Sequence, residues 1–406
     1  MQTSFRLKGS LGNYLQGCKS DYFTYLYRVI ECLLFSIFVK MIFDHSKNGD
    51  KMKKLILLYI LIFTSFLHSQ IDSTLQQQIE SLTKYNENLE HRLDVLEKNI
   101  DDILWFQRVG DVAFIDKVFM TGPPKWKETD TTDPAFGNPV KFWSYVFIPK
   151  DIDFNKKYPM LVFPHGGVHS NFSTYYTHII RELMYQQYIV VAAEYRGSTG
   201  YGKEHYEKID YGGREIEDVD SSRKYMIDNY EFVDSVRVGL IGWSHGGLIS
   251  LMNIFKYPQH YKVAFAGVPV SDLITRLNYM DEDYRELYSA DYHIGQTPEE
   301  NPEEYKRRSP AWNVDKLQTP LLIHTNTNDE DVRFIEVEVL LKALKDAHKD
   351  FQYEIFKELP GGHSFDRQDT KLALTIRLKI YKFIASYLNP PRPFHNIEEI
   401  RKAVYR

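Results

Sequence analysis

The pentapeptide Gly242-Trp243-Ser244-His245-Gly246 restricts the possible folds of this chain more than any other segment. It follows an apolar run at residues 236–241 and opens a helix-like stretch at 246–257. In a Gly-x-Ser-x-Gly turn between a strand and a helix, the serine takes a strained backbone conformation, and the glycines let strand and helix approach closely. The segment therefore predicts that Ser244 is an exposed nucleophile at the end of a strand.

Apolar runs of strand type alternate with helical stretches over most of the chain after Gly110. Alternation of this kind indicates a mostly parallel sheet with helices on both faces, which is the α/β class. We expect this domain at residues 111–390, followed by a C-terminal tail at 391–406. Residues 272–310 break the alternation and are rich in Tyr, Asp and Glu, so a lid-like insertion is expected there. Strands are predicted at 140–148, 160–164, 188–193, 236–241, 263–268, 321–324 and 351–356, and helices at 215–228 and 246–257.

A serine becomes a good nucleophile only when a neighbouring base removes its proton. His363 lies in a glycine-flanked turn after the predicted strand at 351–356, and it is the candidate base. An acid that orients this histidine is expected after the strand at 321–324, where Asp329, Glu330 and Asp331 are all candidates. The chain order of serine, acid and histidine is that of the α/β-hydrolase fold.

Stabilisation of the reaction's oxyanion requires backbone N–H donors near the serine. The segment His165-Gly166-Gly167 ends an earlier strand and predicts one donor near Gly167. The second predicted donor is the N–H of His245, the residue after the nucleophile. His169, His178 and His245 lack the spacing of a metal-binding motif, so we expect no metal and no other cofactor.

Together these segments resemble the catalytic domain of the prolyl oligopeptidase family of serine peptidases, over residues 142–388. The string Glu194-Tyr195-Arg196-Gly197-Ser198-Thr199-Gly200-Tyr201-Gly202 separates this family from general esterases. The resemblance implies an α/β-hydrolase fold and a peptidase activity. The family's Asp-x-x-Val spacing places the triad acid at Asp329, with Asp331 as second choice. The other matching motifs are His165-Gly166-Gly167, the Ser244 pentapeptide with Gly247, residues 319–324 and 328–332, and Gly361-Gly362-His363.

The chain departs from the family pattern in three ways. Residues 110–140 are too few for the N-terminal β-propeller that members usually carry, so the acidic peptide anchors of that propeller are not carried over. His165 stands where several branches have Tyr, so a backbone N–H near Gly167 must serve as the donor, as in the acylaminoacyl-peptidase-like branch. Val168 stands where that branch usually has Pro. The mechanism is unaffected by these changes, but the substrate is left open.

We therefore predict a serine hydrolase that cleaves short peptides through an acyl-enzyme on Ser244. A carboxylesterase acting on acylated sugars or phenolic esters would use the same residues. A third alternative, from another class, is a non-catalytic assembly protein built on a hydrolase scaffold.

An apolar 4-3 repeat runs through residues 71–109, and mostly polar side chains, among them Lys98, fill the positions between. This spacing predicts a coiled-coil helix through which the chain forms a homo-oligomer. Asn86 falls at an a position, where it favours a two-stranded pairing, and the orientation of the strands is not determined. The alternative is one amphipathic helix lying on the hydrolase surface. The repeat consists of Leu75, Ile79, Leu82, Asn86, Leu89, Leu93, Leu96, Ile100 and Ile103.

The N-terminal region has the features of an export signal at residues 52–70. Lys51, Lys53 and Lys54 precede an apolar run at 55–67, which is shorter than the roughly 20 residues of a membrane-spanning helix. We expect translation to begin at Met52, with residues 1–51 as a mis-called upstream extension, and the protein to be exported to the periplasm or secreted. The alternative is a membrane-anchored protein that retains the apolar segments 29–43 and 55–67.

Charge and cysteine content exclude other partners. A net charge of -5 provides no basic surface for nucleic acid, so we expect none to bind. The two cysteines, Cys18 and Cys32, precede the folded region, which therefore has no disulfide framework.

Overall fold

The computed structural model describes residues 50–404, which belong to two compact units, Met1–Tyr85 and Asn86–Arg406. In the first unit, residues 50–85 are helical and form the beginning of α2 (Asp50–Val109). The predicted export signal at 52–70 lies in this helix, whereas residues 1–49 of the predicted upstream extension lie outside the described residues. Between residues 50 and 404, no helix combines the length and the apolar character needed to cross a membrane.

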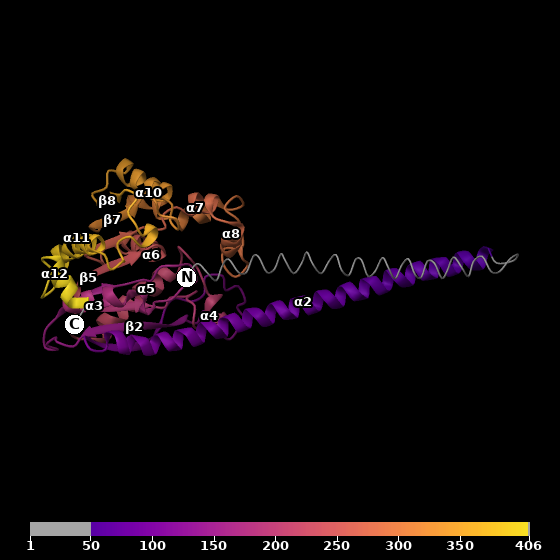
Figure 1. Ribbon diagram of the computed structural model, residues 1–406, viewed down its shortest axis with the longest axis horizontal. Helices are drawn as coiled ribbons and strands as arrows, with labels where there is room; N and C mark the ends of the chain where they lie inside the picture. The colour runs from indigo at the N-terminus through magenta and orange to yellow at the C-terminus, as the bar shows by residue number, and fades with distance from the viewer. Residues whose placement is uncertain (1–49, 405–406) are drawn as a thin grey trace. The chain divides into compact units, whose positions relative to one another are not determined.

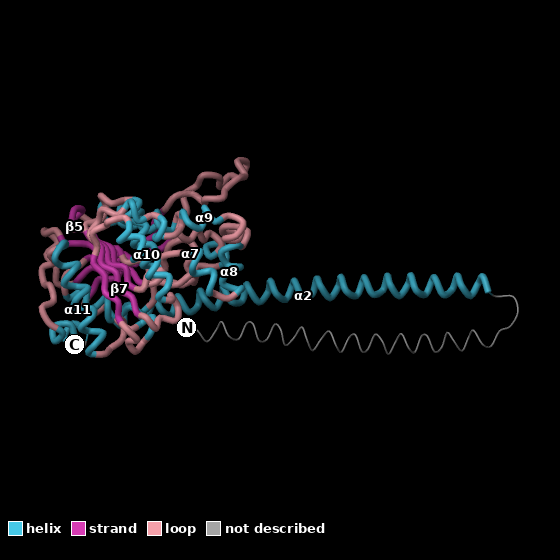
Figure 2. The backbone as a smooth tube through the Cα atoms, turned by 90° about the horizontal axis from the view of Figure 1, so that it is seen from above, coloured by secondary structure: helices cyan, strands magenta, loops and turns pink. Residues whose placement is uncertain are grey.

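The second unit is built on an eight-stranded sheet with the order β1-β2-β4-β3-β5-β6-β7-β8 (Figures 1 and 2). β2 pairs antiparallel with β1 and with β4, and all other neighbours are parallel. Seven strands match the predicted runs, and β1 is an additional edge strand. The strands are β1 (Ala113–Thr121), β2 (Lys141–Pro149), β3 (Tyr158–Val162), β4 (Ile189–Ala193), β5 (Val233–Trp243), β6 (Val263–Gly267), β7 (Leu321–Asn326) and β8 (Gln352–Phe356).

Helices cover both faces of the sheet because the central strands are apolar on both sides. One core lies between the sheet and α5 (Glu215–Asn229), α6 (His245–Lys256) and α10 (Phe334–Asp346). The other lies between the sheet and α3 (Thr177–Tyr185), α11 (Lys371–Leu388) and α12 (Ile397–Val404), together with the end of α2. The predicted α/β-hydrolase architecture is confirmed.

The interruption at residues 272–310 consists of three short helices between β6 and β7: α7 (Leu273–Tyr279), α8 (Glu282–Ser289) and α9 (Pro302–Arg307). The first begins at Asp272, whose side chain accepts a hydrogen bond from the Ile274 N–H at 3.0 Å and caps the helix. A shorter helix, α4 (Lys203–Tyr206), follows β4. Since α7 starts just after β6, the insertion begins at the carboxyl edge of the sheet.

The last turns of α2 face the hydrolase body with the side opposite the apolar repeat, so the repeat itself faces away from the body. On the docked side, Trp105 is fully buried and stacks on Phe172 with ring centroids 5.6 Å apart. On the other side, Leu93 is 58% exposed and Ile103 is 70% exposed. These last turns do lie on the hydrolase body, as in the alternative interpretation, but the apolar stripe is not the face that makes the contact.

Candidate active site

Ser244 occupies the turn between β5 and α6 with φ 59° and ψ -124°, a backbone conformation that residues other than glycine rarely adopt. Such a backbone costs on the order of 1–3 kcal/mol and persists only where the surroundings fix it. The Ser244 N–H donates to the Gly267 carbonyl at 2.9 Å, and its carbonyl accepts from the Val270 N–H at 3.1 Å. Bonds to the segment at the end of β6 therefore hold the serine in place.

Each glycine of the pentapeptide is required by close backbone contacts. A Cβ atom on Gly242 would lie 2.3 Å from the Gly246 carbonyl oxygen, and one on Gly246 would lie 2.3 Å from the Pro164 carbonyl oxygen. Both distances are far below any real Cβ contact, and backbone atoms cannot swing aside. The two glycines therefore allow α6 to start directly against β5 and against the end of β3.

His363 and Asp329 form a hydrogen-bonded pair. The Nδ1 atom of His363 lies 2.7 Å from Oδ2 and 2.9 Å from Oδ1 of Asp329, whose side chain is fully buried. A carboxylate at Nδ1 fixes the tautomer that carries its proton there and leaves Nε2 as the basic nitrogen. The contact therefore orients the imidazole ring with Nε2 on the side away from Asp329.

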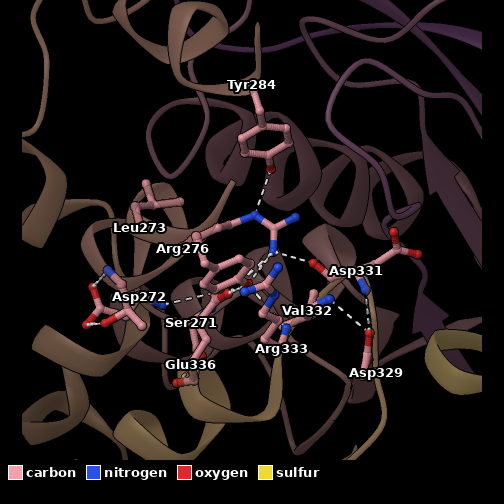
Figure 3. Close-up of polar contacts among 12 residues, drawn as sticks. Ser271, Asp272, Leu273, Arg276, Tyr284, Asp329, Asp331, Val332, Arg333 and Glu336 are labelled. Carbon is pink, nitrogen blue, oxygen red and sulfur yellow. Dashed lines mark hydrogen bonds and ion pairs between the residues drawn. The ribbon is translucent and has the colours of Figure 1, made fainter. Parts of the chain in front are cut away.

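The loop after β7 distinguishes between the candidate acids. Asp331 and Val332 donate their backbone N–H groups to Oδ1 of Asp329, each at 2.9 Å. Figure 3 shows the side chain of Asp331 pointing away from that of Asp329. Glu330 lies beside Gly362, where a Cβ atom would meet its carboxylate at 2.0 Å. Asp329 is thus the acid that contacts His363, and Asp331 contributes only its backbone to this contact.

Helix α7 of the insertion supports the same loop (Figure 3). Nη1 of Arg276 donates to the Asp331 carbonyl at 3.0 Å and lies 3.4 Å from Oε2 of Glu336. The Tyr279 hydroxyl accepts from the Arg333 N–H at 3.2 Å. The insertion therefore helps to position the acid loop, a role that the sequence analysis did not foresee.

The predicted oxyanion donors lie on two segments that meet at the serine. A Cβ atom on Gly166 would be 3.2 Å from Cβ of Ser244 and 2.9 Å from the Trp243 carbonyl oxygen. The Gly166 N–H donates to the Tyr176 hydroxyl at 3.3 Å. Gly166 and Ser244 therefore lie close together, and Gly167 and His245 are the residues that follow them. His245 is the first residue of α6, so its N–H has no acceptor within the helix.

The side chain of His165 binds the string at 194–202 that follows β4. Its Nε2 lies 2.9 Å from the Ser198 hydroxyl, and its ring stacks on Tyr195 with centroids 4.2 Å apart. Tyr195 also donates to the His165 carbonyl at 3.0 Å. Burial lowers the pKa of His165 to about 3, so the ring is neutral at physiological pH. The string therefore holds the glycine loop through a neutral histidine.

Lys98 of α2 is a supporting residue that the sequence analysis missed. The heptad pattern predicts a solvent-facing outer position for Lys98. Its side chain is instead 1% exposed, and its Nζ lies 2.9 Å from Oε1 of Glu194. Its Nζ donates to the Phe172 carbonyl at 2.6 Å, and both Glu194 oxygens accept from the Phe172 N–H at 3.2 Å. Oε2 of Glu194 is 3.6 Å from Nε2 of His165. Helix α2 is thereby tied to both ends of the 165–172 loop.

His245 and His169 are packed against the residues around the serine turn. His245 is fully buried, neither ring nitrogen has a hydrogen-bond partner, and burial lowers its pKa to about 3. His169 stacks on Tyr206 with centroids 3.3 Å apart. Across residues 50–404, no three His, Cys, Asp or Glu side chains are grouped to hold a metal ion.

A strained serine at the end of β5, a histidine–aspartate pair and adjacent backbone donors define the class of serine-dependent α/β-hydrolases. Within that class, residues 174–391 match the model of the prolyl oligopeptidase family. The chain belongs to the prolyl oligopeptidase family.

Curated relatives include human dipeptidyl peptidase 8, which is 31% identical over 245 residues, and mouse acylamino-acid-releasing enzyme, which is 30% identical over 215 residues. These alignments cover 56% and 51% of this chain but only 26% and 29% of the relatives. The chain thus spans about a quarter to a third of their length.

Solved structures with the same fold include an acylaminoacyl peptidase bound to Z-Gly-Gly-Phe-chloromethyl ketone and a Mycobacterium tuberculosis puromycin-hydrolyzing peptidase. The first has a TM-score of 0.57 at 19% identity, over 71% of this chain and 44% of its own. The second has a TM-score of 0.55 at 24% identity, over 68% of this chain and 39% of its own. At sequence identities of 19% and 24%, these structural similarities show a shared fold and nothing more specific.

Proposed function

We propose that the protein is a serine peptidase that cleaves short peptides through an acyl-enzyme on Ser244. The observation that carries the proposal is the His363–Asp329 pair at 2.7 Å, in a chain that also holds Ser244 at φ 59° and belongs to the prolyl oligopeptidase family. In this mechanism Nε2 of His363 takes the proton of the Ser244 hydroxyl as its oxygen attacks the peptide carbonyl. Asp329 stabilises the imidazolium that results.

The tetrahedral intermediate places negative charge on the former carbonyl oxygen, and the N–H groups of His245 and Gly167 are the proposed donors to it. His363 then protonates the leaving amine, and the acyl group stays on Ser244. Water then attacks this ester while His363 takes its proton, and His363 returns a proton to the Ser244 oxygen as the carboxylic acid product leaves. The contacts of His165 with Tyr195 and Ser198 support the mechanism by fixing the glycine loop before substrate arrives.

Comparison of an amide and an ester tests whether the site expels an amine. We would measure kcat/KM of the full chain for a p-nitroanilide and a p-nitrophenyl ester of the same peptidyl group, with Ser244→Ala as the blank. Amide turnover within about a hundredfold of the ester, lost in the blank, supports the peptidase. Ester turnover without amide cleavage would replace the proposal by a carboxylesterase, and no turnover of either compound would contradict a hydrolase.

We also infer that the chain self-associates through α2. Most of the apolar repeat of this helix is exposed, from Leu75 at 40% to Ile103 at 70%, and Leu89 is half-buried. A contiguous exposed apolar stripe of this kind indicates a protein partner. Light scattering of the full chain should give a multiple of its monomer mass, and Leu93→Asp should return it to the monomer.

Export through residues 52–70 is proposed from the sequence alone. The supporting features are Lys53 and Lys54 ahead of the apolar run at 55–67. Mass spectrometry of the protein isolated from its native cells tests the proposal. A first residue near Ile71 supports it, and an intact segment 52–70 contradicts it.

A further inference from the structure

We infer that the occupant of the exposed stripe on α2 is a second copy of this chain, paired parallel and in register over the repeat from Leu75 to Ile103. This inference rests on the self-association proposed above and adds its geometry. It concerns the oligomer and is independent of the peptidase activity.

The positions of α2 that contact the hydrolase body are those that a coiled coil does not use. With Asn86 at position a, Lys98 and Trp105 fall at f, Asp101 at b and Asp102 at c, all opposite the a/d seam. Lys98 and Trp105 are buried, and Asp101 accepts hydrogen bonds from the Thr174 N–H at 3.0 Å and hydroxyl at 2.5 Å. The body therefore occupies the outer side of the helix and leaves the pairing side open.

The a/d seam of α2 has exposed apolar side chains and a hollow between them, as the packing of a partner helix requires. Leu93, Leu96, Ile100 and Ile103 are 58%, 55%, 51% and 70% exposed. Leu89, Leu93 and Leu96 line an apolar hollow together with Arg92, Val95 and Asn99. In a coiled coil, each a or d side chain enters such a hollow on the facing helix. The repeat of 29 residues gives a seam of about 43 Å at about 1.5 Å per residue.

Asn86 favours the parallel arrangement. In a parallel, in-register pair each a position faces the same a position of the second copy, so the two Asn86 amides hydrogen-bond to each other. In an antiparallel pair, a positions face d positions, which in this repeat are leucine or isoleucine. The amide would then be buried without a partner, and an unpaired buried polar group is costly.

The charged flanks favour the same arrangement. Arg92 is a g position and Glu97 is the e position five residues later, so Arg92 of one copy meets Glu97 of the other in a parallel pair, twice by symmetry. An antiparallel pair instead places e positions against e positions and g positions against g positions, so Arg92 no longer meets Glu97. Glu90, Arg92 and Glu97 are all exposed beside the seam.

Disulfide trapping decides the orientation. In a full chain with Cys18→Ser and Cys32→Ser, Asn86→Cys should form a covalent dimer on mild oxidation, because facing a positions lie within disulfide reach. Lys84→Cys, at an outer f position, is the matched control and should remain uncrosslinked under the same conditions. The cysteine variants are compared by non-reducing electrophoresis, with light scattering in parallel.

A dimer mass with no Asn86→Cys disulfide would overturn the parallel register and leave self-association intact. A monomer mass at all concentrations would overturn both. Charge reversal adds an independent test: Arg92→Glu should raise the dimer Kd roughly tenfold, since two exposed pairs become repulsive, and adding Glu97→Arg should restore it. Equal Kd values for wild type and Arg92→Glu would also contradict the parallel pairing. Amide cleavage is measured separately and does not affect these outcomes.

Discussion

Replacing Trp105 by alanine tests whether the end of α2 is an integral part of the folded catalytic unit. The indole is 0% exposed, stacks on Phe172 and meets Phe147 with centroids 4.9 Å apart. Its Nε1 has no hydrogen-bond partner, so the substitution removes packing only. Truncating a buried tryptophan costs about 3–5 kcal/mol, because a cavity remains as well as the lost contacts.

Each kcal/mol shifts Tm by roughly 2–4 °C in domains of about 150–250 residues and by less in a larger unit such as Asn86–Arg406, so Trp105→Ala should lower Tm by roughly 5–10 °C. Thermal unfolding of the full chain by near-ultraviolet circular dichroism measures this, at a concentration low enough to keep the chain monomeric. Ile103→Ala, two residues away and 70% exposed, is the matched control, with an expected change within about 0.5 kcal/mol. A Tm for Trp105→Ala within 2 °C of wild type would refute the reasoning, because the helix would then contribute nothing to the fold.

Three other predictions test the site and its support, and two of them include a control substitution. Asp329→Asn should lower kcat on the order of 10⁴-fold by disturbing the imidazole tautomer, whereas Asp331→Asn should stay within about fivefold; equal losses would contradict the assignment. Gly246→Ala puts a Cβ atom 2.3 Å from a carbonyl oxygen and should cost about 1–3 kcal/mol and most of the activity. Gly137→Ala meets no atom within 4 Å and carries only the strain of φ 73°, so it should cost about 1 kcal/mol and keep its activity. Burial raises the pKa of Glu215 from 4.5 to about 7, so its contribution to stability is complete below pH 4.5 and is lost as pH rises through 7. In urea unfolding, Glu215→Gln should remove this loss, on the order of 3 kcal/mol; an unchanged pH dependence relative to wild type would contradict it.

The main elements of the fold were predictable because their signals are local. The turn at Ser244 needs glycine at fixed offsets, and close contacts of 2.3 Å show why those offsets are required. The strands around it are apolar on both faces, which a short sequence window reveals. The pairing of His363 with Asp329 was predictable in chain order, and the family spacing was needed to choose among three neighbouring carboxylates.

The features that were missed depend on contacts between distant segments. β1 (Ala113–Thr121) is an edge strand in which Phe114 and Phe119 are about half exposed, so it lacks a clear alternation of apolar and polar residues. Lys98 looks like a solvent-facing residue of a coiled coil, and only its partner Glu194, nearly a hundred residues away, explains its burial. The support that Arg276 gives to the acid loop likewise spans the insertion.

The buried contact between Lys98 and Glu194 has a consequence for where this enzyme unit begins. The segment that matches the family starts at residue 174, after His165 and Gly167 and far beyond Lys98. A fragment or chimera cut at that boundary, or at Gly110 before β1, would contain Ser244, Asp329 and His363 but leave the Glu194 carboxylate buried without its cation. The shortest autonomous version of this chain therefore has to start within α2, ahead of Lys98, and grafts of the hydrolase should carry that stretch of helix with them.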